Sequence, residues 1–222
     1  MSSSKQIVKE IMEITTDLIG LGLSMDQNFP SEKTERGLTI IGWGNQINLS
    51  IVLKNVGYNQ IYDELLKNNN YNIKLIDGAI IQMMYTFEHD ILLSHRLAFF
   101  PSPELESYQN DPEIYERQEI YADIIAKNII PFPMRFDFDA DEKIFEPIKH
   151  PRSHLTLGQY KNCRIPVSAP LTPEIFIDFI LRNFYSTAYY YYQLDDRQLV
   201  QPFDRTISDE EERVLHVNFF KI

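Results

Sequence analysis

The feature that most constrains the fold is a pair of alternating segments within residues 80–100. In each segment, every second residue falls on the same, mainly apolar face. These residues are Ile81, Met83, Tyr85 and Phe87 in the first segment, and Ile91, Leu93, His95, Leu97 and Phe99 in the second. A period of two is typical of a strand that buries one face. Two polar residues, His89-Asp90, join the segments, and Pro101 follows the second one. The pattern therefore predicts a long antiparallel hairpin that turns at His89-Asp90.

Helices are predicted where apolar residues recur at helical spacing after a capping side chain. Ser3 or Ser4 can cap an N-terminal helix at about 4–19, and Ser208-Asp209-Glu210-Glu211 reads as a capping box. The other expected helices are 58–67, 111–127, and one from Thr172-Pro173-Glu174 to about 184 that 189–192 extends. The other expected strands are 38–43, 47–53, 71–76, 135–139, 155–158 and 214–220, and 26–36 is expected to be a loop.

The order of these elements indicates the fold class. Strands come in runs and helices separate the runs, which favours an α+β fold over regular βαβ units. We expect one α+β domain over residues 1–222, with a mainly antiparallel sheet and helices packed on one face. The length and the 44% apolar content are enough for a full hydrophobic core.

Charge and composition limit the partners. The formal net charge of −11 opposes nonspecific binding to nucleic acid or to anionic membranes, because phosphates would be repelled. Nucleic acid would then bind only through a local basic patch. Cys163 is the lone cysteine, and the polar N-terminus lacks the apolar core of a signal peptide. We expect a cytoplasmic protein that does not act in a membrane and that has a protein partner.

Residues 134–139 form the segment best suited to chemistry. Arg135, Asp137 and Asp139 alternate with apolar residues, so they share one face of a strand. The neighbouring strand is expected at 155–158, where His154 and Thr156 face the same side if its leucines face the core. Charged groups of both signs and an imidazole therefore gather on one sheet face.

Carboxylates beside an imidazole can share acid–base work or hold a divalent cation. The catalytic candidates are Asp137 and His154, and Asp137 with Asp139 is the candidate metal pair. Arg135 and Arg164 would hold a phosphate. No cofactor follows with certainty, and a divalent metal is the one candidate. The competing interpretation is a solvated face with surface ion pairs that contribute little.

Two further positions have open interpretations. Arg96 stands in a greasy strand, so it is expected to pair with a carboxylate such as Asp137 or to bind an anion as part of the substrate site. His150 and His154 are four residues apart, but a strand spans about 13 Å over that distance, so a shared zinc needs a turn between them. Cys163 is expected to be a spectator.

A resemblance appears in Arg135-Phe136-Asp137-Phe138, His150-Pro151-Arg152-Ser153-His154-Leu155, Arg164-Ile165-Pro166 and 173–185. This region, about 135–185, resembles the C-terminal pattern of an uncharacterised bacterial family, a domain of unknown function. The arrangement R-x-D…H-P-x-x-H is also similar to small proteins of toxin–antitoxin and phage-defence loci. The resemblance implies a genomic context and supplies no catalytic residue.

Two functions remain open at this point, so whether the chain is an enzyme is undecided. The first is a toxin-type or defence-associated phosphodiester hydrolase. The second is a noncatalytic subunit that docks a partner through the same face. The acidic charge favours the subunit, and the mixed His/Asp/Arg cluster favours the hydrolase.

Overall fold

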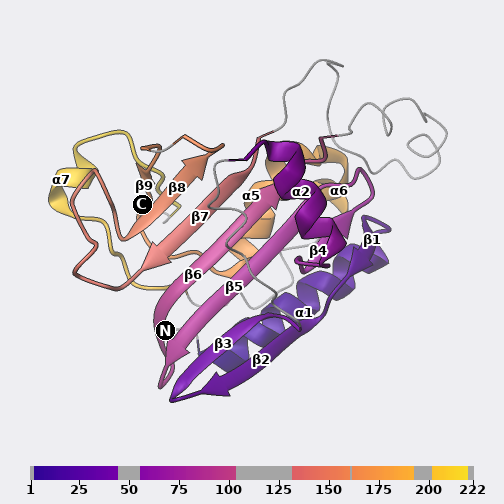
Figure 1. The fold of residues 1–222 in the computed structure, drawn as a ribbon, viewed down its shortest axis with the longest axis horizontal. Helices are drawn as coiled ribbons and strands as arrows, with labels where there is room; N and C mark the ends of the chain where they lie inside the picture. The colour runs from indigo at the N-terminus through magenta and orange to yellow at the C-terminus, as the bar shows by residue number, and fades with distance from the viewer. Residues whose placement is uncertain (1–2, 45–55, 104–131, 161, 193–201, 220–222) are drawn as a thin grey trace.

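The computed structural model describes residues 3–44, 56–103, 132–160, 162–192 and 202–219. Within them one sheet runs in the order β1-β4-β5-β6-β7-β8-β9, and β2 and β3 form a branch in which β3 pairs with β5 (Figure 1). The strands are β1 Ser24–Gln27, β2 Pro30–Glu35, β3 Leu38–Trp43, β4 Ile73–Leu75, β5 Ile80–Glu88, β6 Ile91–Phe100, β7 Met134–Asp139, β8 Ser153–Leu157 and β9 Ile165–Pro166. Each of these strand pairings is antiparallel.

Strands β5 and β6 form the predicted hairpin at the centre of this sheet. His89 and Asp90 turn the chain with φ angles of 49° and 64°, as a tight two-residue hairpin turn requires. A bulge then shifts the register, because Thr86 pairs with Ser94 while Phe87 pairs with Leu92. The bulge places Leu92, rather than the predicted Leu93, against the core. The hairpin prediction is confirmed, with this one-residue correction near the turn.

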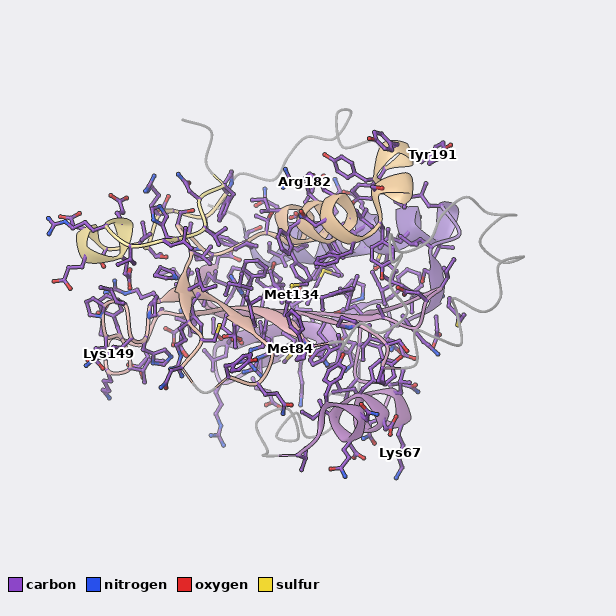
Figure 2. All side chains as sticks on the ribbon, turned by 90° about the horizontal axis from the view of Figure 1, so that it is seen from above. Lys67, Met84, Met134, Lys149, Arg182 and Tyr191 are labelled. Atoms are coloured by element: carbon purple, nitrogen blue, oxygen red, sulfur yellow. The ribbon has the colours of Figure 1, made fainter. Side chains whose placement is uncertain are left out.

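Helices cover both faces of the sheet. The helices are α1 Ser4–Gly20, α2 Tyr58–Lys67, α5 Pro173–Phe184, α6 Ser186–Tyr191 and α7 Asp209–Glu212. Seen edge-on in Figure 2, Arg182 of α5 and Tyr191 of α6 lie on one side of the sheet, and Lys67 of α2 lies on the other. The α+β architecture with a mainly antiparallel sheet is confirmed, and α1 and α5 pack over the main core on one face as expected. The expected packing of helices on one face alone is corrected by α2. Helix α2 adds a smaller core on the opposite face, over Ile80, Ala98 and Phe100.

The helix starts follow their predicted capping residues. Ser3 caps α1 and Ser208 caps α7, each in a capping box. Thr172 accepts a hydrogen bond from the Ile175 amide at the start of α5, with Pro173 in the first helical turn. The predicted extension of α5 is a separate helix, because the chain breaks at Tyr185. The buried Tyr185 hydroxyl donates to Asp77 Oδ2 at 2.8 Å and holds the break in the core.

Two predictions about the edges of the sheet are wrong. Residues 26–36 are not a loop, since β1 and β2 occupy most of them. An exposed edge strand such as β2 needs no apolar alternation, because its backbone pairing with β3 defines it. Residues 214–220 are not a strand in the described part, where Val217 forms only one parallel bridge to Val167. The predicted strand 47–53 and helix 111–127 lie outside the described residues.

Candidate functional site

The alternation of β7 separates its charged residues from its apolar ones. Met134, Phe136 and Phe138 are buried in the sheet core. Arg135, Asp137 and Asp139 lie on the opposite face, where they are partly exposed. The predicted row of charges on one sheet face is therefore confirmed.

The sheet register aligns three site residues across three strands. Arg96 on β6 is directly opposite Asp137 on β7, and Asp137 is directly opposite His154 on β8. Residues opposite each other in adjacent strands have neighbouring side chains. Backbone pairing alone thus places a guanidinium, a carboxylate and an imidazole side by side.

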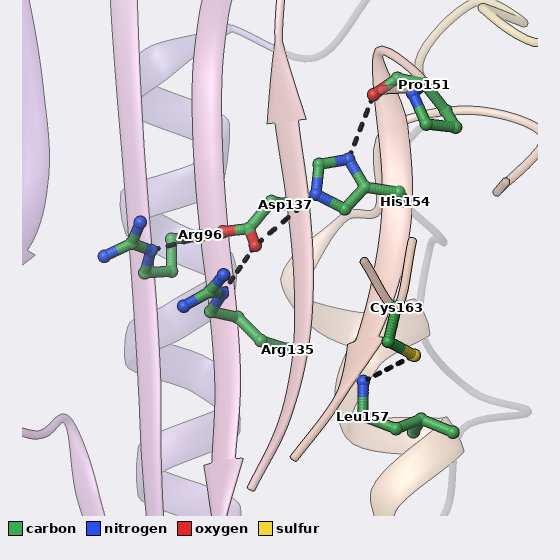
Figure 3. Close-up of polar contacts among 7 residues, drawn as sticks. All are labelled: Arg96, Arg135, Asp137, Pro151, His154, Leu157 and Cys163. Atoms are coloured by element: carbon green, nitrogen blue, oxygen red, sulfur yellow. Dashed lines mark hydrogen bonds and ion pairs between the residues drawn. The ribbon is translucent and has the colours of Figure 1, made fainter. Parts of the chain in front are cut away.

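Asp137 is held by two arginines from different strands (Figure 3). Arg96 Nε donates to Asp137 Oδ1 at 3.2 Å, and Arg135 Nε donates to Oδ2. The prediction that Arg96 pairs with a carboxylate is confirmed. Burial by itself would raise the pKa of Asp137, but Arg135 and Arg96, with His154, outweigh burial and hold the pKa below its ordinary value. Asp137 is therefore an ionised carboxylate with each oxygen engaged.

His154 presents a defined face to this carboxylate. Its Nδ1 lies 3.0 Å from the Pro151 carbonyl oxygen, which only accepts, so Nδ1 carries the proton. The neutral ring then has its lone pair on Nε2, which lies 3.9 Å from Asp137 Oδ2. Burial lowers the pKa of His154, and the attraction of Asp137 offsets this only in part. His154 is thus a neutral base at ordinary pH.

One open pocket with a volume of about 410 Å³ collects the predicted site residues. It is lined by Met84, Thr86, Ser94, His95, Arg96, Arg135, Asp137, Phe138, Asp139, Ile144, His150, His154 and Arg164. All six residues singled out from the sequence line it, together with His150, whose ring centroid is 5.5 Å from that of His154. The structure brings these residues together, while their chemical roles stay predictions.

Three arginines offer free donors in this pocket. Within the described part of the chain, the terminal nitrogens of Arg96 and Arg135 make no hydrogen bond or ion pair. Among the same residues Arg164, half-buried, has no such partner at any of its nitrogens. An arginine has five N–H donors and no acceptor, so these three side chains offer donors to an anion.

The described residues offer few ligands to the divalent cation that the sequence left possible. No group of three or more His, Cys, Asp or Glu suited to a metal is found among the described residues. Both oxygens of Asp137 face guanidinium groups, which would repel a cation. Asp139 Oδ1 accepts a hydrogen bond from the Asp141 amide at 2.9 Å. The spectator Cys163 accepts from the Leu157 amide at 3.4 Å and is not part of the pocket lining (Figure 3).

Sequence reasoning missed several residues of this site. Thr86 and Ser94, from the two strands of the hairpin, line the pocket. The only feature of the sequence that could have indicated them is that they lie on the same sheet face as Arg96. Ile144 comes from the loop after β7, for which the sequence offered no signal. His95 lies behind the pocket with its ring in the core, where Nε2 accepts from the Leu171 amide at 3.0 Å. Burial lowers the pKa of His95 to about 4, so the ring is neutral.

The fold and pocket define an antiparallel α+β protein with an arginine-rich site on one sheet face. The chain belongs to the DUF2290 family of uncharacterised conserved proteins, whose model matches residues 23–219. The expectation of a domain-of-unknown-function family is confirmed, over far more of the chain than the 135–185 region that suggested it. No curated protein and no solved structure is significantly similar to the chain. None of the described helices has the length and apolar character needed to cross a membrane.

Proposed function

We propose that this protein hydrolyses a phosphodiester, with the phosphate held by Arg96, Arg135 and Arg164. The observation that carries the proposal is that three guanidinium groups with free donors line the same pocket as a neutral histidine. The donors suit the nonbridging oxygens of a phosphate, and they stabilise the charge that builds up on them in the transition state. The unprotonated Nε2 of His154 suits a general base.

The proposed step conserves atoms and charge. His154 Nε2 takes a proton from water, and the water oxygen attacks phosphorus. One ester P–O bond breaks, and its oxygen leaves as an alkoxide that receives the proton held by His154. The products are a phosphate monoester and an alcohol. A base positioned in this way contributes about 100-fold or more to the rate.

Asp137 supports this step as a positioning residue. It engages Arg96 and Arg135 through Nε alone, so their terminal nitrogens stay available to the phosphate. Its negative charge also stabilises the imidazolium that forms when His154 accepts a proton. Asp139, at the end of the same row, would orient the attacking water.

The cellular setting that we propose is the bacterial cytoplasm, as part of a defence or toxin–antitoxin locus with a protein partner. Its support is the resemblance of residues 135–185 and the use of a lone cysteine. The second candidate function is a noncatalytic subunit of such a system that docks its partner through the same face. The net charge of −11 favours it.

The test is hydrolysis of bis(p-nitrophenyl) phosphate, followed by the release of p-nitrophenolate with EDTA or with Mg²⁺, Mn²⁺ or Zn²⁺. We expect His154→Ala to lower kcat/KM by about 100-fold or more with the fold intact. His216→Ala is the matched control, because half-buried His216 is not part of the pocket lining and its Nδ1 has a similar 3.0 Å contact, with the Val214 carbonyl. Equal activity in the two variants would exclude His154 as the base. No hydrolysis by the parent under any of these conditions would favour the noncatalytic subunit.

A further inference from the structure

The local charge of the pocket differs from that of its surroundings. Its lining holds three arginines and two aspartates, so it has one net positive charge when the histidines are neutral. A single phosphodiester linkage has one negative charge, and the two therefore match. The whole chain, by contrast, has a formal charge of −11. The pocket therefore attracts a single phosphate, while the net negative charge of the whole chain repels a polymer with many phosphates.

The rim of the pocket is acidic at its hairpin end. The segment 139–150, which supplies Ile144 and His150 to the lining, adds no net charge beyond Asp139, because its other three carboxylates are matched by two lysines and by Arg152, which pairs with Glu142. Across the pocket, exposed Glu88 follows Thr86 on the same face of β5, at the hairpin end. A phosphate that flanks the bound one in a polymer would approach the carboxylate of Glu88. At separations within a Debye length, about 8–10 Å at ordinary salt, this repulsion is felt.

The sheet face also has a closed end. Helix α2 covers the part of this face formed by Ile80, Ala98 and Phe100, all of which are buried beneath it. Among the described elements, α2 therefore stands over the same two strands, β5 and β6, that supply Thr86 and Ser94 to the pocket (Figure 1). A nucleic-acid strand laid along β5 and β6 would meet this helix. A compact ligand would not.

We infer that the pocket takes a small, free phosphodiester, of the class of cyclic mononucleotides, and excludes polymeric RNA and DNA. This inference rests on the proposed function and names its substrate class. Hydrolysis of such a ligand breaks one ring P–O bond, and the freed oxygen keeps the proton delivered by His154. The product is a mononucleotide that stays in one piece.

The experiment compares cyclic AMP with an adenine oligonucleotide of about 12 nucleotides, within the size range of single-strand binding sites. Calorimetric titration of the full chain gives both dissociation constants at about 50 and 200 mM salt. The oligonucleotide offers the same base and many linkages, so a site that admits polymers would bind it more tightly. We expect cyclic AMP to bind at least 10-fold more tightly, with weak salt dependence. Arg164→Gln should weaken cyclic AMP binding by 10-fold or more.

Glu88→Lys tests the acidic rim directly. We expect it to strengthen oligonucleotide binding by about threefold or more, because it replaces repulsion by attraction at the rim. Its effect on cyclic AMP should be under twofold. The matched control is Glu13→Lys, which makes the same charge change on exposed α1, across the sheet, and should alter neither ligand.

The outcomes separate this inference from the proposed function. Tighter binding of the oligonucleotide than of cyclic AMP, lost in Arg164→Gln, would overturn the inference and leave the phosphodiester site standing. Equal gains in oligonucleotide binding for Glu88→Lys and Glu13→Lys would remove the acidic rim as the reason for selectivity and overturn this part of it. Hydrolysis of bis(p-nitrophenyl) phosphate without any binding of cyclic AMP would also overturn it. No binding and no hydrolysis of any of these compounds would refute both.

Discussion

Arg96 and Arg135 reach Asp137 from two different strands, each through its Nε atom. The side chain of Asp137 is 15% exposed, so an uncompensated charge there would be costly. The two guanidinium groups compensate the charge of Asp137, and the carboxylate between them fixes their separation. At the scale of the single residue, Asp137 thus gives the arginines of the proposed anion site a shared anchor.

Asp137→Asn tests this role through the pH dependence of kcat/KM. The proposed step requires neutral His154, so we expect activity to fall as pH drops through the pKa of that ring. Burial lowers this pKa and the charge of Asp137 raises it in part. Removing the charge lowers the pKa further, so we expect the acid limb of the profile to move to lower pH. The maximal rate should fall by about 10-fold or more, because the arginines and the imidazolium lose their shared partner.

Asp178→Asn is the control for this experiment. Asp178 is also a partly buried carboxylate paired with an arginine, but it lies on α5, on the other side of the sheet. The acid limb should stay in place in this variant. An acid limb that moves to higher pH in Asp137→Asn would contradict the assigned role of Asp137.

At the scale of elements, α1 and α5 are joined by a buried carboxyl group. Glu10 of α1 accepts a hydrogen bond at Oε1 from the backbone amide of Glu174, 2.7 Å away at the start of α5. One helix therefore caps another that lies 164 positions further along the chain. Burial raises the pKa of Glu10 to about 8, and the nearby Glu174 and Glu13 add to the shift.

Glu10→Gln should stabilise the protein, and by more at higher pH. The unfolded carboxyl ionises near 4.5 and the folded one near 8, so the folded state binds more protons between these values and loses stability as pH rises. Glutamine keeps an oxygen acceptor for Glu174 and does not ionise. We expect a gain on the order of 2–4 kcal/mol in the free energy of unfolding at pH 8, and little at pH 4.5.

Urea unfolding across this pH range measures the effect. The control is Glu32→Gln, the same change at an exposed position on β2, which should alter the free energy of unfolding by at most about 0.5 kcal/mol. A pH-independent difference between Glu10→Gln and the parent would show that Glu10 titrates normally.

At the scale of the whole molecule, the sheet separates a dry face from a charged one within the same strands. His95 and Arg96 are adjacent in β6, yet His95 contacts Tyr85 and Phe138 in the core while Arg96 faces the pocket. The titratable ring of His95 therefore lies on the buried face of the sheet, on the side opposite the pocket. Its protonation opposes folding, because burial disfavours the charged ring.

His95→Gln should make stability less sensitive to acid. An unfolded histidine protonates near pH 6.5 and folded His95 near 4, so the unfolded state binds more protons in between and stability falls as pH drops from 6.5 to 4. Glutamine offers an oxygen to the Leu171 amide without this loss. We expect the melting temperature of the variant to fall less than that of the parent over this range. His216→Gln, the same change at a half-buried histidine, should follow the parent.

The local pattern of residues was sufficient to predict the strands at the centre of the sheet and the starts of the helices. The alternation of apolar and polar residues in β5, β6 and β7 predicted which residues face the core, because every second side chain of a strand lies on one face. The capping residues Thr172 and Ser208 marked helix starts, because their side chains bond to amides three residues away. Strands β1 and β2 escaped detection, because backbone pairing rather than apolar burial defines a charged edge.

How these parts meet depends on the tertiary structure. The local sequence is enough to place Arg135, Asp137 and Asp139 on one face, since that depends on neighbouring residues alone. It did not determine that Arg96 and His154 lie opposite Asp137, because register depends on hairpin bulges and on chain connections of many residues. The position of Arg164 in the pocket and the hydrogen bond from α5 to Glu10 depend on how the whole chain folds. Their partners are distant in sequence, and no local periodicity reports such contacts.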